Sequence, residues 1–201
     1  MALLSSSASF VRYTVEGDLP ENFWSFMAER LAAFSFRDID DTLDEYSIGW
    51  VSLYNMFDST FHDDSYRVAD HIALALRVDE RKISPAVLKK FCLKEENRLK
   101  KERQVPRLNR SQRLEIKERM THLLMQKATA VPAVYDLCWN LAESTLLFFA
   151  TSQKAQAMLE DFFKESFNLS LVLQIPYLTA ARLLSPAEQE ALEGLRPEIF
   201  V

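Results

Sequence analysis

A chain of 201 residues, 48% of them hydrophobic, is long enough to bury the core of one good-sized domain. Its 24 Lys and Arg residues against 29 Asp and Glu residues give a formal net charge of −5, and no apolar run approaches the ~20 residues of a membrane span. Only three glycines are present, none in a G-x-G-x-x-G or G-x-x-x-x-G-K pattern, which argues against a phosphate-binding loop.

The cysteine content and the N-terminal sequence indicate in which cellular compartment the protein is expected. Cys92 and Cys138 are too few for a disulfide framework or a metal set, and both lie in apolar patterns typical of buried free thiols. The first ten residues lack the basic region and long apolar core of a signal peptide. We therefore expect a cytoplasmic protein without a membrane segment and without a cofactor.

The first third of the chain alternates between strand and helix patterns. Alternating apolar residues predict strands over 7–15 and 72–78, and the run 46–53 around Gly49-Trp50-Val51 is interpreted as another strand. A helix opens at Pro20 with apolar residues at helical spacing. An acidic stretch over 38–45 and a polar stretch over 58–70 lie between these elements and are typical of loops.

The next segment, 81–127, concentrates the positive charge. It holds 15 of the 24 bases and 5 of the 29 acids, so it carries +10 while the rest of the chain carries −15. A positive segment on an acidic body is a candidate footprint for a polyanion, although such runs are also common on solvated helices.

Two helices are predicted in this segment. Ser84-Pro85 opens the first, which meets no Gly or Pro until Pro106, and Asn109 with Gln112 can form a capping box for the second. We expect helices over 84–103 and 110–127 to form an antiparallel hairpin. Apolar residues over 83–91 and 120–125 should root it in the core, with Phe91 as a packing residue there.

The remainder returns to strand patterns. Strands are predicted over 134–141, 145–150 and 169–175, with a helix after Ser152 and a short capped helix from Ser185. The fold class is therefore α+β: a mainly antiparallel sheet with packed helices and an inserted long helical hairpin. Residues 1–80 and 131–184 should form the core domain, 81–130 the basic hairpin and 185–201 a C-terminal helix and tail. The expected core residues are Trp50, Leu74, Leu76, Trp139, Phe148, Phe162 and Leu171.

Several of these pieces together resemble the RdgC family of recombination-associated proteins. They are Gly49-Trp50-Val51, the alternating strand from Ala73 to Arg77, the entry from Glu80 to Lys89 into a long charged helix, and the run from Ser152 to Ala155 that leads a helix. The resemblance spans roughly residues 8 to 184. Family members extend further at the C-terminal side, so this chain resembles a short or C-terminally truncated relative. It also lacks the aromatic that the family tends to place shortly after the hairpin.

The resemblance implies a nucleoid-associated protein that binds double-stranded DNA with little sequence preference. It further implies a homodimer that closes into a ring, with a recombinase as a possible protein partner whose assembly on DNA is restrained. The missing C-terminal part helps build that ring in the family, so ring closure by this chain is left open.

Within the basic segment we predict a set of DNA-contacting cations on the two helices. Flexible cations that track phosphates need no sequence motif, and no base-reading motif is visible. The predicted contacts are Lys89, Lys90, Lys94, Arg98, Lys101, Arg110, Arg113 and Lys117.

Two other functions compete with DNA binding. The family has also carried an exonuclease label, and Asp38, Asp40, Asp41, Asp44 and Glu45, or His62-Asp63-Asp64, could supply carboxylates for a hard cation. Neither set has a recognised ligand spacing, so we expect no metal site and no enzymatic activity. The remaining alternative is a protein-interaction module or dimerisation scaffold without direct DNA binding.

Overall fold

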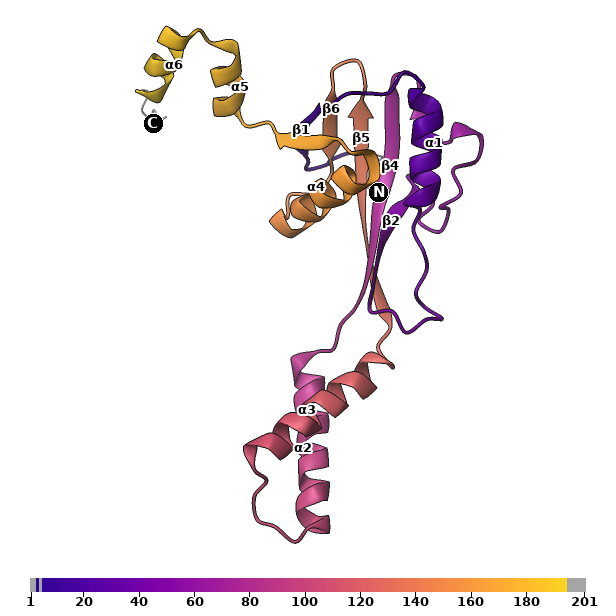
Figure 1. The fold of residues 1–201 in the computed structure, drawn as a ribbon, viewed down its shortest axis with the longest axis vertical. Helices are drawn as coiled ribbons and strands as arrows, with labels where there is room; N and C mark the ends of the chain where they lie inside the picture. Colours follow the sequence, from indigo (N-terminus) through magenta and orange to yellow (C-terminus); the bar gives the residue numbers. More distant parts are fainter. Residues whose placement is uncertain (1–2, 4, 195–201) are drawn as a thin grey trace.

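The computed structural model describes residue 3 and residues 5–194 (Figure 1). An antiparallel sheet is its central element, with strand order β2-β4-β5-β6-β1-β7 and a short β3 paired to β4. The strands are β1 Val11–Glu16, β2 Tyr46–Ser52, β3 Arg67–Val68, β4 His71–Arg81, β5 Ala130–Asn140, β6 Thr145–Phe148 and β7 Ser170–Leu173. The α+β class with an antiparallel sheet is confirmed.

One face of the sheet carries the main core. Alternation places Leu74 and Leu76 of β4 beside Leu137 and Tyr135 of β5 on that face. Helices α1 (Phe23–Ala33) and α4 (Gln153–Phe167) cover it (Figure 1). Ser152 begins α4 as predicted, because its hydroxyl accepts a hydrogen bond from the Ala155 amide.

Trp50 lies at the centre of this core. Its ring packs on Phe162, Phe163 and Phe167 of α4, and its Nε1 donates to the Ser166 hydroxyl at 2.9 Å. Six of the seven predicted core residues are buried. The exception, Leu171, is only half-buried because β7 is the last strand of the sheet.

Gly49 allows the chain to cover the outer edge of β2. A Cβ at this position would lie 2.3 Å from the Phe36 Cα, so only glycine admits the segment that runs alongside. Hydrogen bonds from the Trp50 amide to the Phe34 carbonyl and from the Phe36 amide to the Trp50 carbonyl hold that segment to the strand. The outward backbone amide and carbonyl of Trp50 on this edge of the sheet are thereby paired.

Two helices separate β4 from β5: α2 Pro85–Glu102 and α3 Arg110–Met125. They occupy the predicted positions, and Asn109 and Gln112 form the predicted capping box. In Figure 1 the helices cross obliquely beyond the end of the sheet, so a regular antiparallel hairpin is not confirmed. We call this unit the helix pair.

The expected rooting of the helix pair in the core was wrong. Neither cluster of buried apolar side chains in the described chain includes a residue of α2 or α3, and Val87, Phe91 and Leu123 are exposed. The physical reason is the length of β4 and β5, which pair as far as Arg81 and Ala130 and carry the helices clear of the sheet.

The C-terminal part differs from the sequence prediction. The predicted strand 169–175 ends at Leu173, and Ile175 instead precedes an unexpected helix α5 (Pro176–Leu183) with proline at its first turn. Helix α6 (Pro186–Glu193) begins with the predicted capping box of Ser185 and Glu188. No helix within the described residues is both long enough and apolar enough to cross a bilayer.

Candidate nucleic-acid interface

A row of lysines follows the side of α2 that faces away from α3. At about 100° per residue, Lys90, Lys94 and Lys101 lie opposite the half-buried Leu88, Cys92 and Leu99. All three lysines are exposed, and none forms an ion pair with another described residue. We call these three lysines the α2 ridge, which extends about 16.5 Å along the helix axis.

Arg98 lies beside the ridge, but other residues of α2 already engage its guanidinium. Its Nε and Nη2 donate to the two oxygens of Glu95 at 2.8 and 2.6 Å, and its Nη1 donates to Glu102 at 2.7 Å. The hydrogen bond to Glu95 and the charge of Glu102 raise the pKa of Arg98. Much of its charge is therefore offset locally, which sets it apart from the three lysines.

Glu95 connects the two helices. Its carboxylate accepts from Arg98 of α2 and also from Arg119 of α3, and only 15% of its side chain is exposed. The hydrogen bond from Arg98, supported by Arg119, lowers the pKa of this carboxyl despite its partial burial. The ion pair between Glu95 of α2 and Arg119 of α3 thus links the two helices.

Three of the other predicted cations form a second group. Lys89, Arg113 and Lys117 line a groove of about 430 Å³ between α2 and α3, with the Cys92 thiol among its walls. Arg113 donates from Nε and Nη2 to the Leu108 carbonyl at 3.3 and 3.1 Å, closing the turn before α3. Burial raises the pKa of Cys92, so its thiol stays protonated.

The eight predicted residues therefore do not share one surface. Lys89 is turned by about 100° from Lys90 around α2, which separates the groove with Lys89 from the α2 ridge. Arg110 is exposed at the first position of α3 and does not line the groove with Lys89.

A second groove, of about 570 Å³, lies on the other side of α2. Phe91 and Met120 line it together with Lys94, Arg98 and Lys101, so the α2 ridge forms part of its rim. We call it the Phe91 groove. Phe91 was predicted as a packing residue at the root, but its side chain is exposed at this groove. The sequence signal that could have indicated this exposure is the position of Phe91 directly after Lys90, on the flank of α2 that also carries Arg98.

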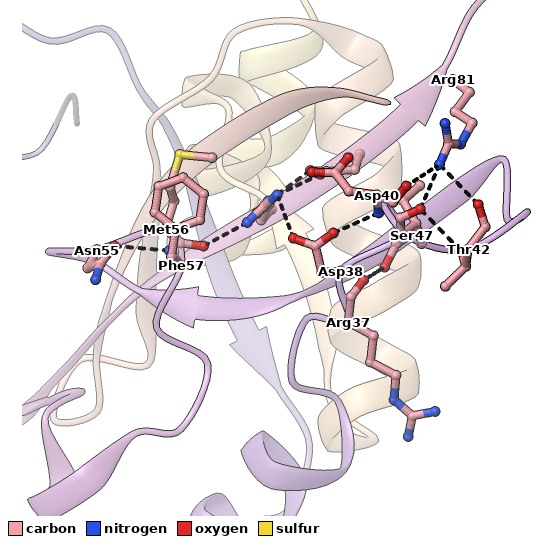
Figure 2. Close-up of polar contacts among 12 residues, drawn as sticks. Arg37, Asp38, Asp40, Thr42, Ser47, Asn55, Met56, Phe57 and Arg81 are labelled. Carbon is pink, nitrogen blue, oxygen red and sulfur yellow. Dashed lines mark hydrogen bonds and ion pairs between the residues drawn. The ribbon is translucent and has the colours of Figure 1, made fainter. Parts of the chain in front are cut away.

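Arg81 has a role that charge counting missed. Its guanidinium donates to the carbonyls of Ile39 at 2.6 Å and Asp44 at 2.9 Å, and further bonds reach the carbonyls of Asp40 and Thr42 (Figure 2). It also donates to the Ala128 carbonyl, just past α3. Arg81 thus ties the acidic stretch to the base of the helix pair.

The acidic stretch is held by a second arginine, Arg77. Asp38 lies 3.7 Å from its guanidinium, which also makes a two-pronged contact to Asp79 at 2.7 and 2.9 Å and donates to the Met56 carbonyl (Figure 2). The Asp79 hydrogen bond raises the pKa of Arg77 despite its burial. This contact network stabilises the loop and engages one of the five acids suggested as metal ligands.

The remaining acids do not gather into a metal-binding arrangement. Within the part of the chain that the structure describes, no three His, Cys, Asp or Glu side chains lie together so that they could hold an ion. His62 and Asp64 belong to a short 3-10 helix, and the side chain of Asp63 lies outside the described residues.

Comparison with known proteins found a match to a protein family. The model of a protein family described as "Putative exonuclease, RdgC" matches residues 11–182, which include the sheet, α4 and the whole helix pair. No curated protein matches the chain.

Proposed function

The chain belongs to the RdgC family, and from that membership we propose that it binds double-stranded DNA without sequence preference and thereby modulates recombination. The family itself fits a recombination-related role. Direct contact with DNA, and the residues that make it, are the part that we propose.

The α2 ridge is the observation that carries this proposal. Three exposed lysines, with no acidic partner among residues 5–194, stand on a helix that projects from the acidic body of the molecule. At 3.4 Å per phosphate along one strand of duplex, a ridge of about 16.5 Å is as long as about five phosphates. Lysines that approach these phosphates displace condensed counterions, which supplies affinity regardless of base sequence.

The engagement of Arg98 supports binding without base readout. Sequence-specific recognition of guanine usually needs an arginine fork that is free to make two parallel hydrogen bonds. Glu95 occupies the fork of Arg98, and the three cations of the adjacent α2 ridge are lysines, which act as flexible point charges. We therefore expect discrimination between sequences to be weak.

The test is a salt titration of binding to two 20-bp duplexes of unrelated sequence, followed by fluorescence anisotropy between 50 and 300 mM NaCl. If about five to eight phosphates are neutralised, log K should fall against log salt with a slope of roughly −4.5 to −7 for both duplexes. The absence of binding at 50 mM salt, a slope near zero, or a large difference between the duplexes would refute the proposal.

A second candidate is a protein-interaction or dimerisation scaffold, favoured by exposed apolar side chains on the helix pair. Leu114 is 56% exposed and Leu93 is 49% exposed. Sedimentation of the protein over a hundredfold range of concentration, with and without duplex, separates the two functions. A dimer that never binds duplex would favour the scaffold. We propose no catalytic role for the acidic stretch 38–45 or for His62-Asp63-Asp64.

A further inference from the structure

The Phe91 groove holds an exposed aromatic ring beside cations of the proposed DNA-binding surface. Phe91 is 36% exposed, and the Lys90 ammonium lies 5.9 Å from its ring centroid. The groove has a volume of about 570 Å³, within the range of sites that hold small organic groups. An exposed aromatic ring among cations is the arrangement that proteins use to stack on bases of single-stranded nucleic acids.

We propose that the Phe91 groove captures an unpaired base of single-stranded DNA, with Phe91 as the stacking surface. The proposal rests on the DNA-binding function above and specifies the form of DNA that the same helix pair holds most tightly. It predicts a preference for unpaired or locally opened DNA over intact duplex of equal length.

The position of the groove relative to the α2 ridge explains this preference. Lys94 and Lys101 belong to both, so a strand whose phosphates contact these lysines can place its bases over the groove. Asn97 also lines the groove, and its amide can donate to and accept from the edge of a base. In intact duplex the bases are stacked and paired, so only the phosphate contacts are available.

The acidic residue in the groove does not oppose a nucleic acid. Glu95 also lines it, but Arg98 and Arg119 engage its carboxylate. These contacts offset its charge, and the pair with Arg119 also links α2 to α3. Three cations and this one acid line the groove, so its lining carries a net positive charge.

The first experiment compares affinities for a 20-nucleotide thymine oligonucleotide and a 20-bp duplex. Phe91→Leu keeps an apolar side chain but removes the aromatic face, and should weaken binding of the oligonucleotide about 5- to 150-fold. Duplex binding should change by less than about twofold, because phosphate contacts do not depend on the ring. Phe91→Tyr keeps the aromatic face and should retain the wild-type affinity for the oligonucleotide.

The matched control is Phe57→Leu, which removes another exposed aromatic ring, 75% exposed, from a loop outside the helix pair. It should leave both affinities unchanged. Equal loss of both affinities in Phe91→Leu, no loss of either, or equal weakening by Phe91→Tyr and Phe91→Leu would overturn the stacking site.

A change on the DNA side tests the same contact without altering the fold of the protein. An oligonucleotide in which abasic sites replace the thymines keeps its phosphates, and should bind wild type as weakly as Phe91→Leu binds the intact oligonucleotide. Unchanged affinity of wild type for the abasic strand would contradict the proposal. Failure of duplex binding by wild type would instead refute the proposed function, while the dependence on Phe91 is measured separately on the single strand.

Discussion

Replacing the three lysines of the α2 ridge by glutamine is the sharpest perturbation of the proposed DNA site. Lys90→Gln, Lys94→Gln and Lys101→Gln together remove three positive charges and keep long, polar side chains with good helix propensity. All three side chains are exposed on the side of α2 opposite Leu88 and Leu99, so the helix pair should keep its fold.

The magnitude follows from counterion release. If each lysine neutralises one phosphate, the slope of log K against log salt should flatten by about 0.9 for each, or about 2.7 in total. When wild type and variant converge at 1 M salt, that difference corresponds to a roughly 500-fold weaker affinity at 0.1 M. The loss should be the same for unrelated duplexes.

The assay is the anisotropy titration between 50 and 300 mM NaCl, with circular dichroism to verify helix content. A matched control removes three charges elsewhere: Lys127→Gln, Lys154→Gln and Lys164→Gln, all exposed and none on α2. Its slope should stay close to that of wild type. Equal flattening in both triple variants would show that only net charge matters, and unchanged binding by the ridge variant would place the DNA site elsewhere.

Three further predictions concern stability, pH and catalysis. Leu76 is fully buried, so Leu76→Ala should lower the free energy of unfolding by about 2–5 kcal/mol in urea denaturation. The control Leu114→Ala, at an exposed position, should change it by less than about 0.5 kcal/mol. A loss below about 0.5 kcal/mol for Leu76→Ala would contradict its burial. The pKa of Glu95 is lowered on folding, so its contribution to stability is present at pH 7 and is lost as the pH falls through that lowered pKa. Wild type and Glu95→Gln should therefore differ in melting temperature at pH 7 and converge from about pH 5 downward, and a gap that persists in acid would exclude this ion pair as its cause. Finally, the protein should not degrade linear DNA in Mg²⁺ or Mn²⁺; metal-dependent degradation that disappears in Asp40→Ala would establish a nuclease instead.

Local patterns determined much of the fold. The alternation of apolar residues marked β1, β4, β5 and β7, because a strand with one buried face repeats every two residues. The capping residues Asn109 and Ser185 marked helix starts, since their partners lie only three residues away. Helix α5 was missed where Ile175 continued the strand alternation up to Pro176, so two local signals overlapped.

The candidate site was predicted only in part. The charge of 81–127 and the helical spacing of Lys90, Lys94 and Lys101 can be read directly, because neighbours along one helix are fixed by its geometry. The same reading could not separate Arg98 from the lysines. Its partners Glu95 and Glu102 lie within one turn, but which acids engage it depends on side-chain conformation and on Arg119 of the other helix.

Only the tertiary structure determined which distant segments contact one another. Arg81 reads as one more base of a positive segment, yet its guanidinium reaches the Ile39 and Ala128 carbonyls, 42 and 47 residues away. Phe91 reads as a core residue, yet β4 and β5 carry α2 beyond the core and leave the ring exposed. A residue's type and its local periodicity limit the kinds of contact that it can make. The length and pairing of the strands determine which segments lie close enough to make them.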